Sequence, residues 1–184
     1  MQAPGGKGED PSGGFDLEGW TFPYFDETLG NVMGSQMTPP FALLLGRKTY
    51  DVFAGYWPTQ GADDPINQAT KYVVTSHPID SNWEVTIPIS GDVPAAIREL
   101  KGQAGPMLQV HGSSQLIQTL LEHDLVDELW LKTFPVVLGK GKRLFGLGTV
   151  PAAFKLIEST VVTPSGVVVA SYQRYGEVKL GSFT

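Results

Sequence analysis

The sequence predicts an α/β fold: a three-layer α/β/α sandwich on a mainly parallel sheet, with an antiparallel C-terminal hairpin. The first observation is that segments with helical apolar spacing alternate with short apolar strands, as in βαβ units. The second is a pair of β-rich runs that flank the turn sequence TPSG (163–166). Together they favour a parallel sheet that carries antiparallel strands at one edge.

Composition and charge narrow the class of protein. The 184 residues are expected to form one domain, 1–184, which opens with a Gly/Pro-rich loop over residues 1–19. A net charge of −6 disfavours a general nucleic-acid or anionic-membrane surface, because the protein's field repels phosphate. The lack of cysteine excludes disulfides and thiolate chemistry. The sequence has no signal-peptide pattern and no apolar run of the roughly 20 residues that span a bilayer. We therefore expect a cytoplasmic protein without nucleic-acid or membrane partners.

Each element of the first half has a local signal. Apolar residues at helical spacing after Pro23 predict a helix over about 24–36, which the proline pair 39–40 ends. The run FALLLG (41–46) lies between that pair and a charged segment and is expected to be a buried strand. The segment RKTYDVFAGYW (47–57) is expected to follow as a short helix.

The middle of the chain continues the alternation. β-Branched residues predict strands at KYVVT (71–75) and over 85–89, the latter cut short by Pro88. Asp92 is the expected N-cap of a helix that Gly102 ends. There follow a strand at PMLQV (106–110), a helix opened by GSS (112–114), a mostly extended segment (127–138) and a glycine-rich loop (139–148).

The C-terminal hairpin is predicted from turn chemistry. Two long strands, about Lys155–Thr163 and Val167–Tyr175, flank the turn. Pro164 suits the second position of a β-turn because its φ is already fixed, and Gly166 suits the fourth. The two strands are expected to pair with each other, and their exposed tyrosines offer a surface for a two-fold symmetric homodimer.

Two strand-to-helix turns, LLLGRKTY and QVHGSSQL, have the features of an anion site. The unpaired N–H groups and positive dipole end of a helix N-terminus attract anions, and glycine lets a ligand approach the backbone. Two such turns on one sheet can clamp the pyrophosphate of a dinucleotide. The alternative is that both are ordinary turns with solvated basic residues and a serine cap. The turn residues are Gly46, Arg47, Lys48 and Thr49 in the first, and Gly112, Ser113 and Ser114 in the second.

A third segment suits a phosphate or an adenine, and the sequence lacks the common nucleotide-binding and metal-binding motifs. VTSHP (73–77) ends a strand with Ser76 and His77, which suit a terminal phosphate or an adenine. GKGKRLFG has no third glycine at the right place for the Rossmann fingerprint and no helix after it, so it matches neither that fingerprint nor a P-loop. The three histidines lie in unrelated elements without metal-ligand spacing, so no metal site is expected.

The order of these motifs resembles the dihydrofolate-reductase-like family, and within it the branch of the C-terminal reductase domain of the riboflavin-biosynthesis protein RibD. The resemblance runs from about Gly19 to the C-terminus, through LLLGRKTYDVF, VVTSHP and LQVHGSSQLIQTLLEHDLVDELWLKTFPVVLGKGKRLF. It implies the three-layer fold and hydride transfer from NADPH to a C=N or C=O bond of a pyrimidine- or pteridine-like heterocycle. The reaction of 5-amino-6-(5-phosphoribosylamino)uracil reductase is the nearest example. No deaminase-type zinc motif is present, which implies a stand-alone reductase-like domain.

Other functions stay open under this resemblance. The chain could be a dihydrofolate reductase proper, a non-catalytic NADPH-binding protein, or a structural remnant that binds no ligand. Binding of NADPH separates the last of these from the others.

The resemblance assigns cofactor contacts residue by residue. The first turn matches the pyrophosphate and 2′-phosphate side of NADPH, the segment 75–77 matches the adenosine phosphate, and the second turn matches the pyrophosphate. His111 stands where the family has the first glycine of a pair. The implied cofactor-binding residues are Gly46, Arg47, Lys48, Thr49, Thr75, Ser76, His77, Gly112, Ser113 and Ser114.

Asp26 is the candidate catalytic proton donor. It lies among aromatic residues in GWTFPYFDE, and a carboxyl in a partly apolar pocket has a raised pKa. In dihydrofolate reductases the acid stands two residues after a similar proline, whereas Asp26 stands three after Pro23, a rotation of about 100° on a helix. The alternative is a solvent-facing acid that stabilises the first helical turn.

The substrate is implied to be a small heterocycle. Trp20 and Phe25 lie beside the candidate acid and are the expected contacts to the ring. Lys140 and Arg143, with Lys142 between them, are the expected contacts to a ribose phosphate. The alternative for these basic residues is a solvated loop.

The resemblance also gives the opening loop a role. Relatives begin with a strand that borders the nicotinamide, and this first strand is apparently absent here, which would leave its neighbours with unpaired backbone groups. Three explanations are open: a natural start upstream of Met1, a lost segment, or another segment in its place. Residues 1–19 are placed like the mobile lid over the active site of dihydrofolate reductases.

Overall fold

The computed structural model describes residues 1–38, 40–80, 83–157 and 160–183. Its helices are α1 (Glu27–Gln36), α2 (Arg47–Tyr56), α3 (Pro65–Gln68), α4 (Val93–Gly102) and α5 (Ser114–Glu122). Its strands are β1 (Phe41–Gly46), β2 (Lys71–Val74), β3 (Thr86–Ile89), β4 (Met107–Gln109), β5 (Glu128–Thr133), β6 (Ala153–Leu156), β7 (Val161–Val162) and β8 (Val168–Gly176). Within these ranges, no helix has both the length and the apolar character needed to cross a membrane.

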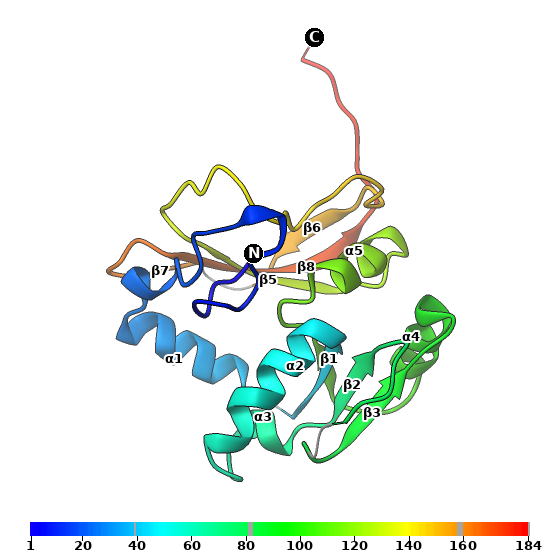
Figure 1. The fold of residues 1–184 in the computed structure, drawn as a ribbon. Coiled ribbons are helices and arrows are strands. Elements are labelled where there is room, and N and C mark those ends of the chain that lie inside the picture. Colours follow the sequence, from blue (N-terminus) through cyan, green and yellow to red (C-terminus); the bar gives the residue numbers. More distant parts are fainter. Residues whose placement is uncertain (39, 81–82, 158–159, 184) are drawn as a thin grey trace.

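Four strands form a parallel sheet in the order β3-β2-β1-β4 (Figure 1). The central strand β1 pairs with β2 on one side, where Leu43 is opposite Lys71, and with β4 on the other, where Leu43 is opposite Gln109. All residues from Phe41 to Leu45 are buried, as expected for a strand covered on both faces. The predicted buried strand FALLLG is therefore confirmed.

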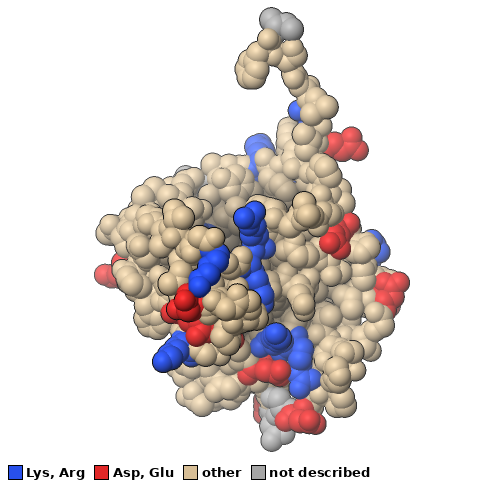
Figure 2. Space-filling view, turned by 45° about the horizontal axis from the view of Figure 1, so that its top comes forward, with Lys and Arg blue, Asp and Glu red and all other residues tan. Residues whose placement is uncertain are grey.

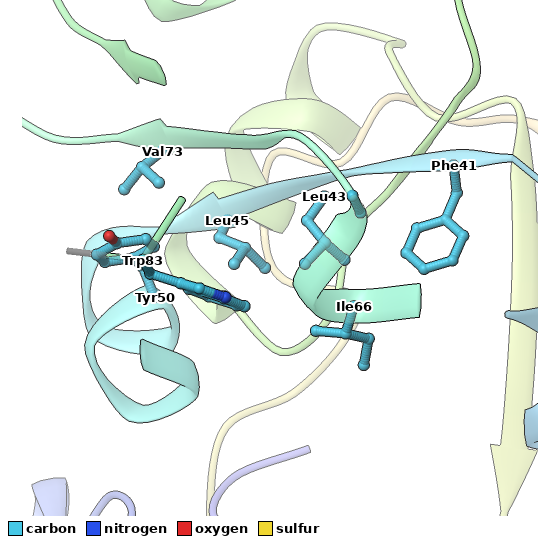
Figure 3. Close-up of a cluster of buried hydrophobic side chains, with 8 residues drawn as sticks. Phe41, Leu43, Leu45, Tyr50, Ile66, Val73 and Trp83 are labelled. Atoms are coloured by element: carbon cyan, nitrogen blue, oxygen red, sulfur yellow. The ribbon is translucent and has the colours of Figure 1, made fainter. Parts of the chain in front are cut away.

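Helices cover both faces of this sheet, because successive side chains of β1 point to opposite sides. Leu43 packs with Tyr50 of α2 and Ile66 of α3 (Figure 3). Leu44 packs on the opposite face with Ile97 of α4 and with leucines of α5. The predicted three-layer arrangement is confirmed, with α2 and α3 on one side and α4 and α5 on the other.

The remaining strands form an antiparallel sheet in the order β5-β8-β6, and β7 also pairs with β8. The TPSG turn is confirmed, because the Gly166 N–H donates to the Thr163 carbonyl at 2.9 Å. The long strand predicted over 155–163 is instead the two short strands β6 and β7, and residues 158–159 lie outside the described residues. Helix α1 covers this sheet, with Leu29 packed on Val167 and Val169.

The single sheet expected from the sequence is split in two. In the described part of the chain, β4 pairs only with β1, and β5 pairs only with β8. A cavity of about 550 Å³ separates them, lined by both strands and by apolar side chains of α4 and α5. A strand's hydrophobic pattern shows which faces are buried but not which edges pair, so the sequence could not predict the split. The two facing edges agree with the unpaired backbone expected when the family's first strand is absent.

Helix α4 begins at its predicted N-cap, whereas helix α1 begins later than predicted. The Asp92 carboxylate accepts the Ala95 N–H at 3.0 Å, as predicted. Helix α1 begins at Glu27, later than expected, because residues 22–24 form a 3₁₀ turn and Asp26 takes the N-cap position. The proline pair 39–40 is expected to end α1, and Pro39 lies outside the described residues. Strand β3 continues through Pro88 because it is an edge strand, where a missing N–H costs little.

Candidate functional site

Hydrogen bonds join the two predicted strand-to-helix turns. Strands β1 and β4 are parallel neighbours, so the turns that follow them meet at one edge of the sheet. The Gly46 N–H donates to the Ser113 hydroxyl at 2.9 Å, and the Ser113 N–H donates to the Thr49 hydroxyl at 2.9 Å. This reciprocal pair holds the start of α2 against the start of α5.

The backbone of the second turn is strained. Gly112 has φ +55°, and a Cβ at this position would lie 3.2 Å from the Thr49 Oγ1 atom. Ser113 also has a positive φ, 55°, which is uncommon for a residue with a side chain. Such a conformation persists only when its surroundings hold it. Here the Ser113 hydroxyl also donates to the His111 carbonyl at 3.0 Å.

Both turns open into one cavity of about 700 Å³, which we call the turn cavity. Helices α2 and α5 both begin at this cavity, so their unpaired N–H groups and positive dipole ends face its interior. Arg47, Lys48 and Lys142 add positive charge to its wall. Figure 2 shows Lys and Arg side chains gathered in the middle of one face of the molecule. All ten predicted cofactor-binding residues line the cavity: Gly46, Arg47, Lys48, Thr49, Thr75, Ser76, His77, Gly112, Ser113 and Ser114.

The segment after β2 forms the far wall of the turn cavity. The Thr75 hydroxyl accepts the His77 N–H at 3.1 Å and donates to the His77 carbonyl at 3.0 Å, which fixes a tight bend. The Arg47 guanidinium donates to the Pro78 carbonyl at 2.6 Å and to the Asp51 carboxylate at 2.8 Å. Arg47 therefore bridges the N-terminus of α2 and this segment.

The opening loop, residues 1–19, packs over the turn cavity, and residues 1–4 and Asp10 line it. Gln2 anchors the loop: its side-chain amide donates to the carbonyls of Asp10 and Ser12 at 2.8 Å, and its carbonyl accepts the Trp20 indole N–H at 2.9 Å. This position over the cavity agrees with the expected lid, and the movement of the loop remains a prediction.

Two ion pairs tie the loop to the glycine-rich segment after β5. Lys142 pairs with Asp10 at 2.5 Å, and Lys140 pairs with Asp16 at 2.8 Å. Desolvation alone would raise the pKa of the Asp10 carboxyl. The hydrogen bonds from Lys142 and Ser12 outweigh it and lower that pKa to about 2.

The residues predicted to contact the substrate do not come together. Trp20, Phe25, Lys140 and Arg143 line neither the turn cavity nor the cavity between the sheets. Trp20 packs edge-on against Phe134 with ring centroids 5.1 Å apart, and Phe25 is 57% exposed. Of the three basic residues in that loop, the one that lines the turn cavity is Lys142.

Asp26 has the geometry of a helix cap. Its carboxylate accepts the Leu29 N–H at 2.9 Å and the Ser165 N–H at 3.0 Å, and it lines neither cavity. The hydrogen bond from Leu29 and those from the Ser165 turn lower the pKa of Asp26 to about 2. The expectation of a raised pKa is therefore wrong, because N–H donors rather than apolar groups meet this carboxylate. Its role as proton donor rests on the resemblance and stays a prediction.

A polar cluster that no sequence pattern indicates lies beside the turn cavity. His111 lines both this cavity and the cavity between the sheets, and its Nε2 atom lies 3.1 Å from the Gln109 side-chain oxygen. Gln36 and Lys132 continue the cluster. Gln109 and His111 are close in the sequence, but Gln36 and Lys132 lie far from them, so no sequence signal could group all four. Among the described residues, no group of His, Asp and Glu side chains could hold a metal ion.

Comparison with solved structures defines the class of this fold. A Shewanella sp. PV-4 protein named for riboflavin biosynthesis gives a TM-score of 0.61 at 23% identity, over 82% of this chain and 81% of that one. A pyrimidine reductase-like protein from Corynebacterium diphtheriae gives 0.58 at 12% identity, over 84% of both chains. Dihydrofolate reductase from Enterococcus faecalis, solved with NADP(H), gives 0.53 at 16% identity, over 83% of both chains. The fold is that of dihydrofolate-reductase-like proteins.

Sequence comparison identifies the family within that class. The family described as the RibD C-terminal domain matches residues 2–169, and the chain belongs to this family. It is 33% identical over 112 residues to the uncharacterized protein YyaP and 30% identical over 103 residues to the uncharacterized protein YwjB, both of Bacillus subtilis. Each match covers 56% of this chain, and the two matches span 58% and 57% of those relatives.

Proposed function

We propose that this protein is an NADPH-dependent reductase that transfers a hydride to a C=N or C=O bond of a pyrimidine- or pteridine-like heterocycle. The observation that carries the proposal is the pair of linked turns at the ends of β1 and β4. They bring two helix N-termini and all ten predicted cofactor residues to one cavity. Membership of the RibD C-terminal domain family supports the same function.

The residues present fit a nicotinamide dinucleotide. A diphosphate requires a concave surface of N–H donors, and the starts of α2 and α5 supply one. Gly112 fits the same purpose, because a Cβ there would make a tight contact with Thr49 and would narrow the approach to the backbone. A volume of about 700 Å³ is within the usual range for cofactor sites.

The positive charge at the wall of the turn cavity favours NADPH, which carries a 2′-phosphate, over NADH. Arg47 lies beside the segment 75–77, which the resemblance matches to the adenosine phosphate. A guanidinium donates several charge-assisted hydrogen bonds to a phosphate, whereas the 2′-hydroxyl of NADH offers no such partner. Arg47 and Ser76 are thus the proposed contacts that favour NADPH over NADH.

The chain's own contribution is to bind and to align. NADPH supplies the hydride when it is bound. The linked turns hold the pyrophosphate, His111 lies at the border between the cofactor site and the second cavity, and loop 1–19 excludes water from the turn cavity.

The experiment measures NADPH binding and NADPH oxidation with the purified protein. NADPH is titrated against tryptophan fluorescence and by calorimetry. Its oxidation is then measured with pterins, dihydrofolate and aminouracil ribotides. We expect saturable NADPH binding and oxidation that depends on one class of heterocycle. Binding without oxidation by any of these compounds would favour a non-catalytic NADPH-binding protein, and no binding would exclude both.

A further inference from the structure

The N–H and the hydroxyl of Ser113, a residue that the resemblance assigns to the cofactor, are both engaged in hydrogen bonds within the protein. The hydroxyl accepts the Gly46 N–H at 2.9 Å and donates its own proton to the His111 carbonyl at 3.0 Å. The Ser113 N–H donates to the Thr49 hydroxyl at 2.9 Å. Both donors of Ser113 are therefore used in the described structure, and neither is left for a phosphate.

The two turns pack reciprocally, because each places its glycine against the hydroxyl-bearing residue of the other. A Cβ on Gly46 would lie 3.6 Å from the Ser113 Cβ atom, and a Cβ on Gly112 would lie 3.2 Å from the Thr49 Oγ1 atom. We call these four residues the turn latch. Ser113 keeps its left-handed backbone, with φ 55° and ψ 49°, within this latch. Contacts inside the protein thus set the spacing between the starts of α2 and α5.

The helix starts on either side of the turn latch have donors that remain for an anion. Helices α1, α3 and α4 are capped by the carboxylates of Asp26, Asp64 and Asp92. Within the described residues, neither α2 nor α5 has such a side-chain cap, so the N–H groups of their first turns lack a capping acceptor. A diphosphate that accepts N–H groups from both starts at once depends on the spacing between them.

We propose that Ser113 is a positioning residue and not a phosphate ligand: it fixes the spacing of the α2 and α5 N-termini so that one diphosphate accepts N–H groups from both. This inference rests on the proposed function, which places a dinucleotide in the turn cavity. A ligand that contacts both helix starts loses one set of hydrogen bonds when the spacing is lost, whereas a ligand held at α2 alone keeps its contacts. Ser113 therefore acts on diphosphates and leaves monophosphates unaffected.

The test compares three probes by calorimetry with the purified protein: NADPH, inorganic pyrophosphate and 2′-AMP. The single phosphate of 2′-AMP is the one that the proposed function assigns to Arg47 and the segment 75–77. We expect Ser113→Ala to weaken NADPH and pyrophosphate by about tenfold or more, the usual loss for a hydrogen bond to a charged group. The Kd of 2′-AMP should change by less than about twofold. An equal loss for all three probes would overturn the proposal, because it would show that Ser113 only maintains the fold.

A double substitution distinguishes positioning from direct contact. Thr49→Val removes the acceptor of the Ser113 N–H and so opens the same latch from the other turn. If the latch acts as one unit, Thr49→Val combined with Ser113→Ala should bind pyrophosphate within about twofold of the weaker single variant. Two independent phosphate contacts would instead give losses that multiply, and that result would overturn the positioning role.

Two further variants separate binding from stability. Glycine also lacks the hydroxyl but favours a positive φ, so Ser113→Gly should melt at a higher temperature than Ser113→Ala and bind pyrophosphate no better. Ser35 is the matched serine on α1, whose hydroxyl donates to the Val32 carbonyl at 2.8 Å, and Ser35→Ala should leave all three Kd values unchanged. Pyrophosphate affinity that follows the melting temperature across these variants would contradict the proposal. Ser113→Gly also provides the test if Ser113→Ala does not fold.

The outcomes separate this inference from the proposed function. NADPH binding that is unchanged in Ser113→Ala would overturn the role of Ser113 and leave the proposed function standing. Pyrophosphate binding that depends on Ser113, in a protein that does not bind NADPH, would support the positioning role and overturn the proposed function. A wild-type protein that binds neither probe would overturn both.

Discussion

At the scale of single residues, most of the chemistry depends on what surrounds each charge. Asp26 and Lys132 make the contrast clear. The Asp26 carboxylate accepts two backbone N–H groups, whereas the Lys132 ammonium has one neutral partner. The first arrangement stabilises a helix, and the second destabilises the fold, because the ammonium loses water on burial and gains no ion pair among the described residues.

Arg47→Ala tests cofactor specificity. The guanidinium is the proposed partner of the 2′-phosphate, so its loss should weaken NADPH by about tenfold or more and leave NADH within about twofold. Calorimetric Kd values for the two nucleotides measure this difference. Arg98→Ala on the exposed face of α4 is the matched control and should affect neither. Equal losses for both nucleotides would contradict the 2′-phosphate contact.

Two substitutions of Asp26 separate a cap from a catalyst. Asparagine can accept the Leu29 N–H but has no second acceptor for the Ser165 N–H, so Asp26→Asn should lower the melting temperature less than Asp26→Ala and should retain NADPH oxidation. Asp26→Ala should lower the melting temperature, because the Leu29 and Ser165 N–H groups lose their acceptor. If Asp26→Asn instead abolished kcat without a change in melting temperature, the proton-donor role would be supported.

At the scale of elements, loop 1–19 is held by charges that respond to acid. The folded pKa of Asp10, about 2, is below its ordinary value of 3.8. The Asp10–Lys142 pair therefore stabilises the loop fully above about pH 4 and loses this effect as the pH falls towards 2. The protection factors of amides in residues 1–19, which compare each exchange rate with the intrinsic rate at the same pH, should fall over that interval. Lys142→Met should show fast exchange of the loop already at neutral pH, whereas Lys179→Met should not.

The elements also show what the sequence could predict. Helices α2, α4 and α5 and strand β1 were predictable, because apolar period, caps and glycine stops are local signals. That the ten predicted cofactor-binding residues line one cavity was predictable from two turns and one strand end, since parallel neighbouring strands end at the same edge. The cluster of Gln36, Gln109, His111 and Lys132 was not predictable, because Gln36 and Lys132 lie far in sequence from Gln109 and His111 and only the folded chain brings them together. The cap that Asp26 forms with the Leu29 N–H agrees with the alternative of a first-turn acid, whereas its contact with the Ser165 N–H was not predictable, because no local pattern connects these two residues.

At the scale of the whole molecule, the main feature is the gap between the parallel and antiparallel sheets. Strands β4 and β5 each face it with an edge that has no strand partner within the described residues. Amides on such an edge exchange with solvent after a smaller local unfolding of the backbone than amides inside a sheet require. We expect β4 and β5 to exchange faster than β1 and β8, as measured by hydrogen exchange with mass spectrometry. Equal protection would show that the gap is closed in solution.

The predicted homodimer also belongs to this scale. Tyr175 is 67% exposed and Val162 64% exposed on the C-terminal sheet, so apolar area is available there. Light scattering with size-exclusion chromatography should give a dimer mass, and Val162→Glu should shift it to a monomer. A dimer that tolerates this substitution would place the interface on another surface.

The TPSG turn has a consequence for how the chain folds. The Ser165 hydroxyl donates to the Tyr24 carbonyl at 2.6 Å, and the Ser165 N–H donates to the carboxylate of Asp26, the residue that caps α1. The first α-helix of the chain therefore acquires its complete set of contacts only after residue 165 has left the ribosome. Contacts of such large sequence separation carry a high loop-closure entropy and slow folding. During synthesis the N-terminal segment is the part that waits longest for its partners, and it is there that a chaperone would find apolar surface still uncovered.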